Sequence, residues 1–163
     1  MAPAQASLLA KLDTQERVRD FLTNAVASGR ASHAYLFLGA PGAGKLDAAW
    51  ALAQAFLCEQ DGCGSCDSCV RVARHTHPDV HYYTPESATG YLIAQTRELL
   101  DDVPLAPIRA KAKVYIIDRA EQLRANTANA LLKTLEEPPE GVMFILLGTL
   151  SLIHISEPTR HSL

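Results

Sequence analysis

The chain has 163 residues, of which 48% are hydrophobic, so it is long enough for one well-buried domain with little left for a second. Its formal net charge of −3 excludes the strongly basic surface that autonomous nucleic-acid binding requires, so any DNA contact would be local or supplied by partners. Residues 1–13 contain one lysine and no apolar run of signal-peptide length, and the longest apolar stretches fall well short of a membrane span. We therefore expect a cytoplasmic domain with reduced thiols and no membrane contact.

The first third of the chain predicts a helix, a strand and a second helix. The first helix opens at a capping box made by Asp13 and Glu16 and continues with apolar residues at helical spacing until Gly29. Residues 34–38 are a short apolar run, which predicts a buried strand that leads into a glycine-rich loop. Residues 45–57 place their apolar side chains on one face, so a helix should follow this loop.

The rest of the chain continues the alternation of strands and helices. Residues 80–83 are a weaker strand, 91–102 a helix stopped by prolines, 114–117 a strand that is apolar on both faces, and 143–147 another buried strand. A column at i+4 spacing predicts one more helix, ending before Pro138: Leu123, Thr127, Leu131 and Leu135. Strands that alternate with helices imply right-handed crossovers and a parallel sheet, so the fold class is α/β.

A phosphate-loop pattern lies between the first strand and the second helix. It reads Gly39-Ala-Pro41-Gly42-Ala-Gly44-Lys45. Backbone N–H groups at a helix N-terminus cradle phosphates, and Lys45 would reach the outer phosphates of a nucleotide such as ATP. Leu46 stands where such loops carry the Ser or Thr that binds magnesium, so bound ATP would be weak or absent. The alternative is a tight strand–helix turn that keeps its glycines for geometry alone.

Asp118 ends the strand at 114–117, where a second acidic motif of phosphate-loop proteins holds the metal through a water molecule. Such enzymes place a glutamate next to it to polarise the attacking water, and here that position is Arg119. The structural alternative, which we favour, makes Asp118 the N-cap of the next helix, with Glu121 completing a capping box. Because Leu46 and Arg119 are independent defects, we predict that the chain does not hydrolyse ATP and assign no catalytic residue.

All four cysteines lie within twelve residues, as Cys58, Cys63, Cys66 and Cys69. Four thiolates in a polar, glycine-containing loop predict one structural Zn²⁺, because they complete its tetrahedron and leave no position for a substrate. The nearby histidines are substitutes in principle, but we interpret them as surface or loop residues: His75, His77 and His81. A zinc ribbon that reads DNA is the functional alternative, and the acidic residues around the cysteines argue against phosphate contact: Glu59, Asp61 and Asp67.

Three segments together resemble the bacterial clamp-loader subunits of DNA polymerase III. They are residues 32–39, the four-cysteine insert, and Asn129-Ala-Leu-Leu-Lys-Thr-Leu-Glu-Glu-Pro-Pro139, and the similarity covers about residues 15 to 149. Residues 77–80, His-Pro-Asp-Val, followed by Pro85-Glu86, and the non-ATPase site look more like the delta-prime subunit than the gamma/tau motor.

The resemblance implies a three-layer AAA+/RecA-like domain over residues 1–149 with a zinc-binding insert at 58–69. It implies a subunit of a hetero-pentameric ring that opens a sliding clamp and loads it onto primed DNA. A delta-prime subunit is a stator that lends an arginine finger, in a Ser-Arg-Cys motif, to a neighbour. Thr149 matches the polar sensor-1 position of the family.

Residues 150–163 do not match the family's continuation, and no Ser-Arg-Cys occurs in the sequence. We therefore expect a truncated or mis-joined frame in which the C-terminal lid and collar domains are absent and the tail is disordered. Without the family's fifth strand, the strand starting at Ala34 should expose an unpaired apolar edge and favour aggregation.

Three hypotheses for function follow. The first is a non-hydrolysing clamp-loader stator, and the second is a gamma/tau-type ATPase, which would want Ser or Thr at 46 and Glu at 119. The third is an unrelated zinc-stapled nucleotide-binding regulator, which leaves the match at 129–139 unexplained. The sequence favours the first.

Overall fold

The structure is a computed structural model that describes residues 7–12 and 15–149. Two 3-10 helices, five α-helices and four strands are found in these residues. In chain order they are η1 (Leu9–Lys11), α1 (Glu16–Ala27), β1 (Ala34–Leu38), α2 (Lys45–Leu57), α3 (Asp67–Ala73), β2 (Val80–Tyr83), α4 (Ile93–Asp102), β3 (Lys113–Ile117), η2 (Ala120–Gln122), α5 (Ala125–Glu136) and β4 (Val142–Gly148).

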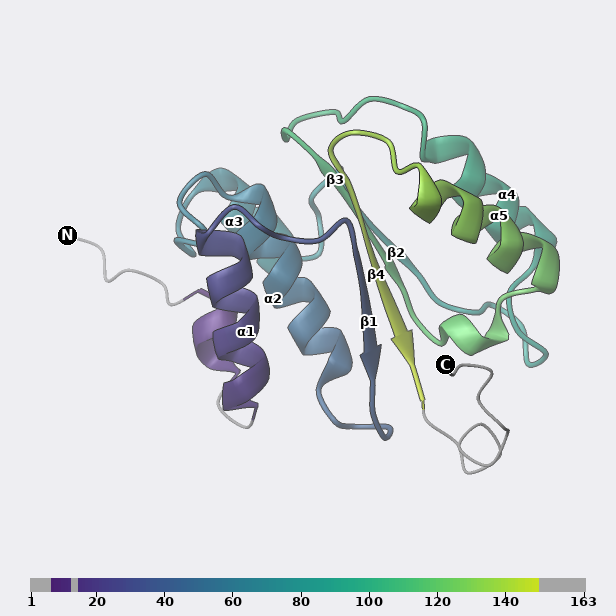
Figure 1. Cartoon of the computed structure of the whole chain (residues 1–163), viewed down its shortest axis with the longest axis horizontal. Coiled ribbons are helices and arrows are strands. Elements are labelled where there is room, and N and C mark those ends of the chain that lie inside the picture. Colours follow the sequence, from purple (N-terminus) through teal and green to yellow (C-terminus); the bar gives the residue numbers. More distant parts are fainter. Residues whose placement is uncertain (1–6, 13–14, 150–163) are drawn as a thin grey trace.

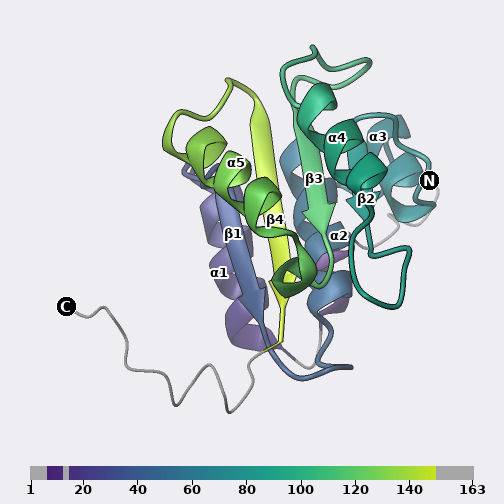
Figure 2. The ribbon, with the colours of Figure 1, turned by 90° about the vertical axis from the view of Figure 1, so that its right-hand side faces the viewer.

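The four strands form one parallel sheet in the order β1-β4-β3-β2, which can be followed from left to right in Figure 2. The register pairs Ala34 with Phe144, and Tyr115 with both Phe144 and His81. Every residue of β3 is buried, as its run of β-branched and aromatic residues predicts for a central strand. The predicted parallel α/β sheet is confirmed.

Helices cover both faces of the sheet, so the domain has three layers. Figure 1 shows α1, α2 and α3 on one side of the strands and α4 and α5 on the other. Alternate residues of β3 serve the two sides: Val114 and Ile116 pack with α1 and α2, whereas Tyr115 and Ile117 pack with α4 and α5. The period of two along a strand explains this division.

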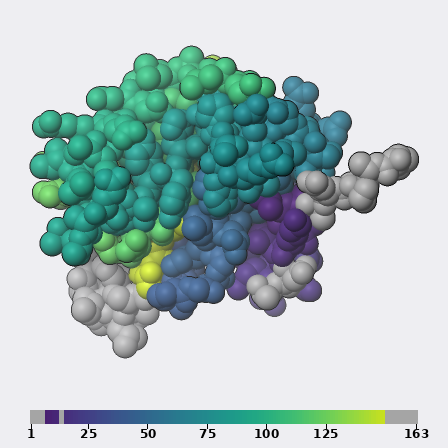
Figure 3. All heavy atoms as spheres, turned by 180° about the vertical axis from the view of Figure 1, so that it is seen from behind, coloured from purple at the N-terminus to yellow at the C-terminus, as the bar shows by residue number. Residues whose placement is uncertain are grey.

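Helix α2 joins the two candidate sites of the molecule. It begins at the glycine loop and ends at Cys58, and its alanines are almost fully buried. Because these side chains are small, α2 packs closely against the sheet, and this packing holds the positions of both helix ends. From behind, the end of β4 (yellow) lies beside the segment that leads into α2 (blue), and the segments from β2 to α5 form the opposite part of the surface (Figure 3).

Strand β1 has a neighbour on one side only within the described residues. Its side chains Leu36 and Leu38 are 59% and 47% exposed, and Phe21 of α1 is 64% exposed. The prediction of a buried strand at 34–38 is therefore wrong for these two leucines, because β1 lies at the edge of the sheet. The position of this strand at an apolar sheet edge agrees with the expectation drawn from the resemblance.

Three helix starts differ from the predictions. Helix α1 has Gln15 as its N-cap, with no side-chain cap, and Asp13 lies outside the described residues, as does the tail at 150–163. Helix α4 starts at Ile93 because Gln95 caps it by accepting from the backbone N–H of Leu92. Leu123 precedes α5 instead of belonging to it. In the described part of the chain, every helix is too short or too polar to span a membrane.

Candidate nucleotide and metal sites

The glycine loop connects the end of β1 to the start of α2, at the carboxyl edge of the sheet. Gly42 and Gly44 have φ of +80° and +89°, a region in which other residues are strained. Gly44 is also the N-cap of α2, so the backbone turns directly into the helix. The two glycines are thus required by the turn itself, which is the shape that a phosphate-binding loop needs.

Lys45 holds the ends of two strands together. Its Nζ donates hydrogen bonds of 2.8 Å to the carbonyl oxygens of Gly39 and Gly148, and it lies 3.3 Å from Oγ1 of Thr149. The loop lysine and the predicted sensor residue, which are 104 positions apart in sequence, therefore meet. In this arrangement the ammonium group is satisfied by protein oxygens, and phosphate oxygens would have to replace them.

A cavity of about 390 Å³ opens beside this lysine. It brings together six of the seven predicted nucleotide-site residues, all except Gly39, with three further side chains and one residue of β4: Pro41, Gly42, Gly44, Lys45, Leu46, Asp47, Asp118, Arg119, Leu147 and Thr149. Leu46 is partly buried against the hydrophobic core under the sheet. A leucine has no oxygen for a cation, so the site lacks the usual direct magnesium ligand.

Asp118 reaches the cavity but does not cap a helix. Its carboxylate accepts hydrogen bonds from the Tyr82 hydroxyl at 3.1 Å and from the backbone N–H of Arg119 at 2.9 Å. The following turn η2 has Arg119 as its N-cap, with no side-chain cap, and α5 starts later. The favoured prediction of an Asp118 capping box with Glu121 is therefore wrong, because Arg119 adopts a left-handed conformation, with φ of +47°.

The Arg119 side chain leads away from the phosphate loop. Its guanidinium donates a hydrogen bond of 3.1 Å to Oγ1 of Thr84, which follows β2 at the far edge of the sheet. A glutamate at this position would offer a carboxylate next to Asp118, whereas the arginine offers only donors. Residue 119 therefore cannot accept a proton from an attacking water.

The four cysteine sulfurs lie within 4.8 Å of one another. Within this cluster the sulfurs of Cys58 and Cys66 are 3.8 Å apart, and those of Cys63 and Cys69 are 3.9 Å apart. A regular tetrahedron with Zn–S bonds of about 2.3 Å has edges of about 3.8 Å. The sulfur positions therefore fit one tetrahedral metal ion.

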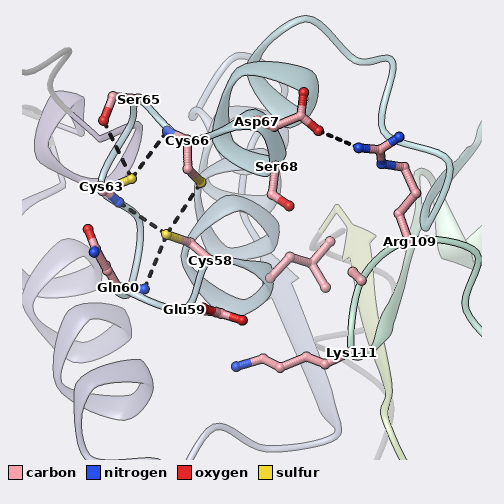
Figure 4. Close-up of a pocket in the computed structure, with 12 residues that line it drawn as sticks. Cys58, Glu59, Gln60, Cys63, Ser65, Cys66, Asp67, Ser68, Arg109 and Lys111 are labelled. Carbon is pink, nitrogen blue, oxygen red and sulfur yellow. Dashed lines mark hydrogen bonds and ion pairs between the residues drawn. The ribbon is translucent and has the colours of Figure 1, made fainter.

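Helix ends and tight turns bring these sulfurs together, and Figure 4 shows three of the four cysteines: Cys58, Cys63 and Cys66. Cys58 is the C-cap of α2, and Cys66 is the N-cap of α3, where its sulfur accepts from the backbone N–H of Cys69 at 3.4 Å. Asp61 has a positive φ in the loop between the helices. Helix α3 was not predicted from the sequence, although Asp67 and Arg71 at i,i+4 spacing, 2.9 Å apart, are a helix signal.

The protonation of the thiols also fits a bound cation. Backbone hydrogen bonds from Ser65 and Cys66 lower the pKa of Cys63 to about 6, whereas burial raises the pKa of Cys66 and of Cys69. Without a cation, the neighbouring thiolates would therefore resist being charged together. A divalent metal ion offsets that repulsion, as it does in structural cysteine sites.

The histidines stay outside the sulfur cluster. His77 lies in the loop between α3 and β2, as one of the two predicted alternatives has it, but it is buried at 4% exposure, and its Nδ1 accepts from the backbone N–H of Asp79 at 3.0 Å. His75 stacks on Trp50 at 3.9 Å between ring centroids, and His81 pairs with Asp102 at 3.3 Å. All three therefore have other structural roles.

Sequence reasoning missed the importance of Asp79. Its carboxylate is fully buried and accepts three backbone hydrogen bonds from residues 108–110, at 2.5–2.7 Å. It anchors the segment that faces the cysteine loop, where Arg109 pairs with Asp67 at 2.9 Å. The His-Pro-Asp-Val motif at 77–80 contains this aspartate, but in the sequence the motif indicates only the resemblance to the family.

These features define a phosphate-loop protein of the AAA+/RecA-like class with an inserted four-cysteine cluster. The chain matches the family described as DNA polymerase III, delta subunit, over residues 14–152. Because this match covers most of the sequence, the chain belongs to that family.

Relatives in the family include two kinds of subunit. The chain is 41% identical to DNA polymerase III subunit delta' of Bacillus subtilis over 138 residues, which cover 83% of the chain and 42% of that protein. It is 43% identical to subunit tau of Escherichia coli over 139 residues, which cover 83% of the chain and 21% of that protein. The chain thus spans less than half the length of these relatives.

Two solved structures are similar in fold. A DNA polymerase III gamma subunit-related protein from Thermotoga maritima has a TM-score of 0.52 and 20% identity, covering 80% of the chain and 38% of that protein. The PCH-2 protein of C. elegans has a TM-score of 0.55 and 17% identity, covering 83% and 38%. At these identities the likeness shows the fold alone.

Proposed function

We propose that the chain is a clamp-loader subunit of the delta-prime type. It would act as a stator in the ATP-dependent loading of the sliding clamp onto primed DNA, as part of the DNA polymerase III holoenzyme in the cytoplasm. Its partners would be the other subunits of a hetero-pentameric ring, with the clamp and DNA engaged through the complex. Membership of the DNA polymerase III delta family supports this role. Residues 1–149 would form the AAA+ domain of this subunit.

The observation that best supports a non-hydrolysing subunit is the set of residues that line the nucleotide cavity. Leu46 leaves it without the hydroxyl that ligates magnesium, and Arg119 brings a donor where hydrolysis needs a carboxylate. Both residues line one cavity, although the Arg119 guanidinium is bonded to Thr84, away from the phosphate loop. We infer that any bound ATP is held by the loop amides and Lys45 and is not turned over.

The alternative is a gamma/tau-type ATPase. The 43% identity to Escherichia coli tau favours it, since the identity to the delta' relative is 41%. Overall identity averages over the whole domain, however, whereas hydrolysis depends on the two positions just named. An unrelated nucleotide-binding regulator does not agree with the family membership.

The four cysteines would hold one structural Zn²⁺ in this subunit. The supporting observations are the tetrahedral spacing of the sulfurs and the anchoring of the loop by two helix ends. With four protein ligands the ion would have no open position, so it would supply stability and not catalysis.

Nucleotide binding with and without magnesium tests the proposal. A fluorescent ATP analogue should bind the chain weakly, with a Kd that changes by less than about twofold when magnesium is removed, because no direct ligand is present. The variant L46T should gain magnesium dependence, and L132T, a similar change on the exposed face of α5, should not. Strong magnesium dependence in the unmodified chain would favour the gamma/tau alternative.

A further inference from the structure

The four sulfurs differ sharply in their exposure to solvent. Cys58 and Cys69 are 3% and 0% exposed, whereas Cys63 is partly exposed and Cys66 is exposed. Cys66 also lines a cavity of about 510 Å³, together with Cys58 and Cys63. A small reagent can therefore reach the cluster from the side on which Cys63 and Cys66 lie.

The side chains around this cavity leave Cys66 exposed. In Figure 4, Arg109 points to Asp67 and is held there by an ion pair of 2.9 Å, while Lys111 lies on the far side of the cavity. The neighbouring hydroxyls of Ser65 and Ser68 are small. No large side chain of the described residues that line this cavity separates Cys66 from solvent.

The spacing of the sulfurs suits two particular disulfides. Cys58 and Cys66 are 3.8 Å apart, and Cys63 and Cys69 are 3.9 Å apart. A disulfide bond is about 2.05 Å long, so each pair needs to close by less than about 2 Å. The first pair would link the end of α2 to the start of α3, and the second would link the intervening loop to α3.

We propose that the cysteine cluster is an oxidation site that reacts with hydrogen peroxide or related two-electron oxidants and forms the crossed disulfides Cys58–Cys66 and Cys63–Cys69, releasing its metal ion. The proposal rests on the metal site proposed above. Crossed pairing keeps both helix ends joined after the metal leaves, so a thiol reductant and zinc restore the original state.

The chemistry is balanced with peroxide as the only oxidant. The sulfur of Cys66 attacks one peroxide oxygen, the O–O bond breaks, and the departing hydroxide takes a proton to become water, which leaves a sulfenic acid on Cys66. The Cys58 thiolate then attacks that sulfur, the S–O bond breaks, and the departing hydroxide takes a proton from solvent to become a second water. A second peroxide does the same for Cys63 and Cys69. Four thiolates are oxidised, two peroxides are reduced, and Zn²⁺ loses all its ligands.

The test uses the full chain loaded with one zinc per chain, treated with increasing hydrogen peroxide. Free zinc is followed with a chromogenic chelator, remaining thiols by alkylation, and linkages by peptide mass spectrometry. We expect one zinc released as four thiols disappear, with Cys58–Cys66 and Cys63–Cys69 as the linkages, and full recovery after reductant and zinc are added. Brief alkylation before oxidation should modify Cys66 roughly tenfold faster than Cys69.

The variants C66S and S68A provide the comparison. The S68A variant should release zinc at the rate of the original chain, and C66S should release it several-fold more slowly. If C66S does not retain zinc, the alkylation order in the original chain decides the role of Cys66. Thiols that survive excess peroxide, or linkages between Cys63 and Cys66, would overturn the proposal. Purified protein that never binds zinc but still forms the crossed disulfides would overturn the metal site and leave the oxidation site standing.

Discussion

The ammonium group of Lys45 lies 2.8 Å from the backbone carbonyl of Gly148, which is 103 residues further along the chain. The same group bonds the carbonyl of Gly39, so one side chain joins the carboxyl ends of β1 and β4. In a phosphate loop this lysine is expected to serve the nucleotide. Here it also stabilises the sheet at the carboxyl end of the edge strand β1.

The first prediction concerns this structural role. The variant K45M should lower the free energy of unfolding by roughly 1–3 kcal/mol in the absence of nucleotide, because two partly buried carbonyls lose a charged donor. Urea denaturation measures the change. The control K133M alters an exposed lysine of α5 and should stay within about 0.5 kcal/mol of the original chain. Equal stability of both variants would mean that Lys45 has no structural role.

A second prediction concerns Asp79 and acid stability. Burial alone would raise the pKa of Asp79, but the backbone hydrogen bonds from Ala110, Ile108 and Arg109 lower it below its ordinary value. A lowered pKa in the folded state means that this carboxylate contributes stability above about pH 4, and that the contribution is lost as pH falls through the folded pKa.

The variant D79N should therefore lose roughly 2–4 kcal/mol at neutral pH, since an amide N–H₂ would face a backbone donor. Its unfolding free energy should also fall less steeply below pH 4 than that of the original chain. Urea titrations at several pH values measure both effects. The variant D101N, at an exposed position of α4, should keep the original acid slope.

The third prediction concerns the apolar sheet edge. The variant L36K places a charge on exposed β1 and should reduce aggregation of the chain at least about threefold, because edge charges block strand pairing. Light scattering at fixed concentration measures it. The control L132K changes a residue of nearly equal exposure, 57% against 59%, on α5. If both variants aggregate alike, the edge is not the cause.

The strand positions could be predicted from the sequence because each strand is a short apolar run that lacks the spacing of a helix. Residues 114–117 are apolar on both faces and β3 is central, and the prolines after Asp102 end α4 where expected. Burial of β1 was not predictable in the same way. An apolar run predicts a strand whose burial is favourable, but whether neighbouring elements bury it depends on its place in the strand order.

At the sites, too, features set by neighbouring residues were predictable, whereas features set by distant residues were not. The loop glycines and the cysteine spacing are local patterns, so their geometry followed from the sequence. Asp118 was misjudged because capping depends on the φ of Arg119, which no composition rule signals. The backbone donors that bond the buried Asp79 carboxylate come from 29–31 residues away, so only the folded chain reveals them.

The fourth prediction concerns removal of metal. Purified chain should contain one zinc, and a strong chelator should remove it and make the four thiols titratable. Amide hydrogen exchange in α3 should then become fast, because Cys66 and Cys69 hold that helix, while β3 stays protected in the core. Chain without zinc and with freely reactive thiols would contradict the metal site. Simultaneous loss of protection in β3 would show that the ion stabilises the whole domain.

The most direct test of the central claim is steady-state ATP hydrolysis by the full chain with magnesium. A stator that lacks the magnesium hydroxyl at Leu46 and a glutamate at Arg119 should show turnover no higher than that of K45A. Hydrolysis clearly above background in the original chain, abolished by K45A, would contradict the account and identify a gamma/tau-type ATPase.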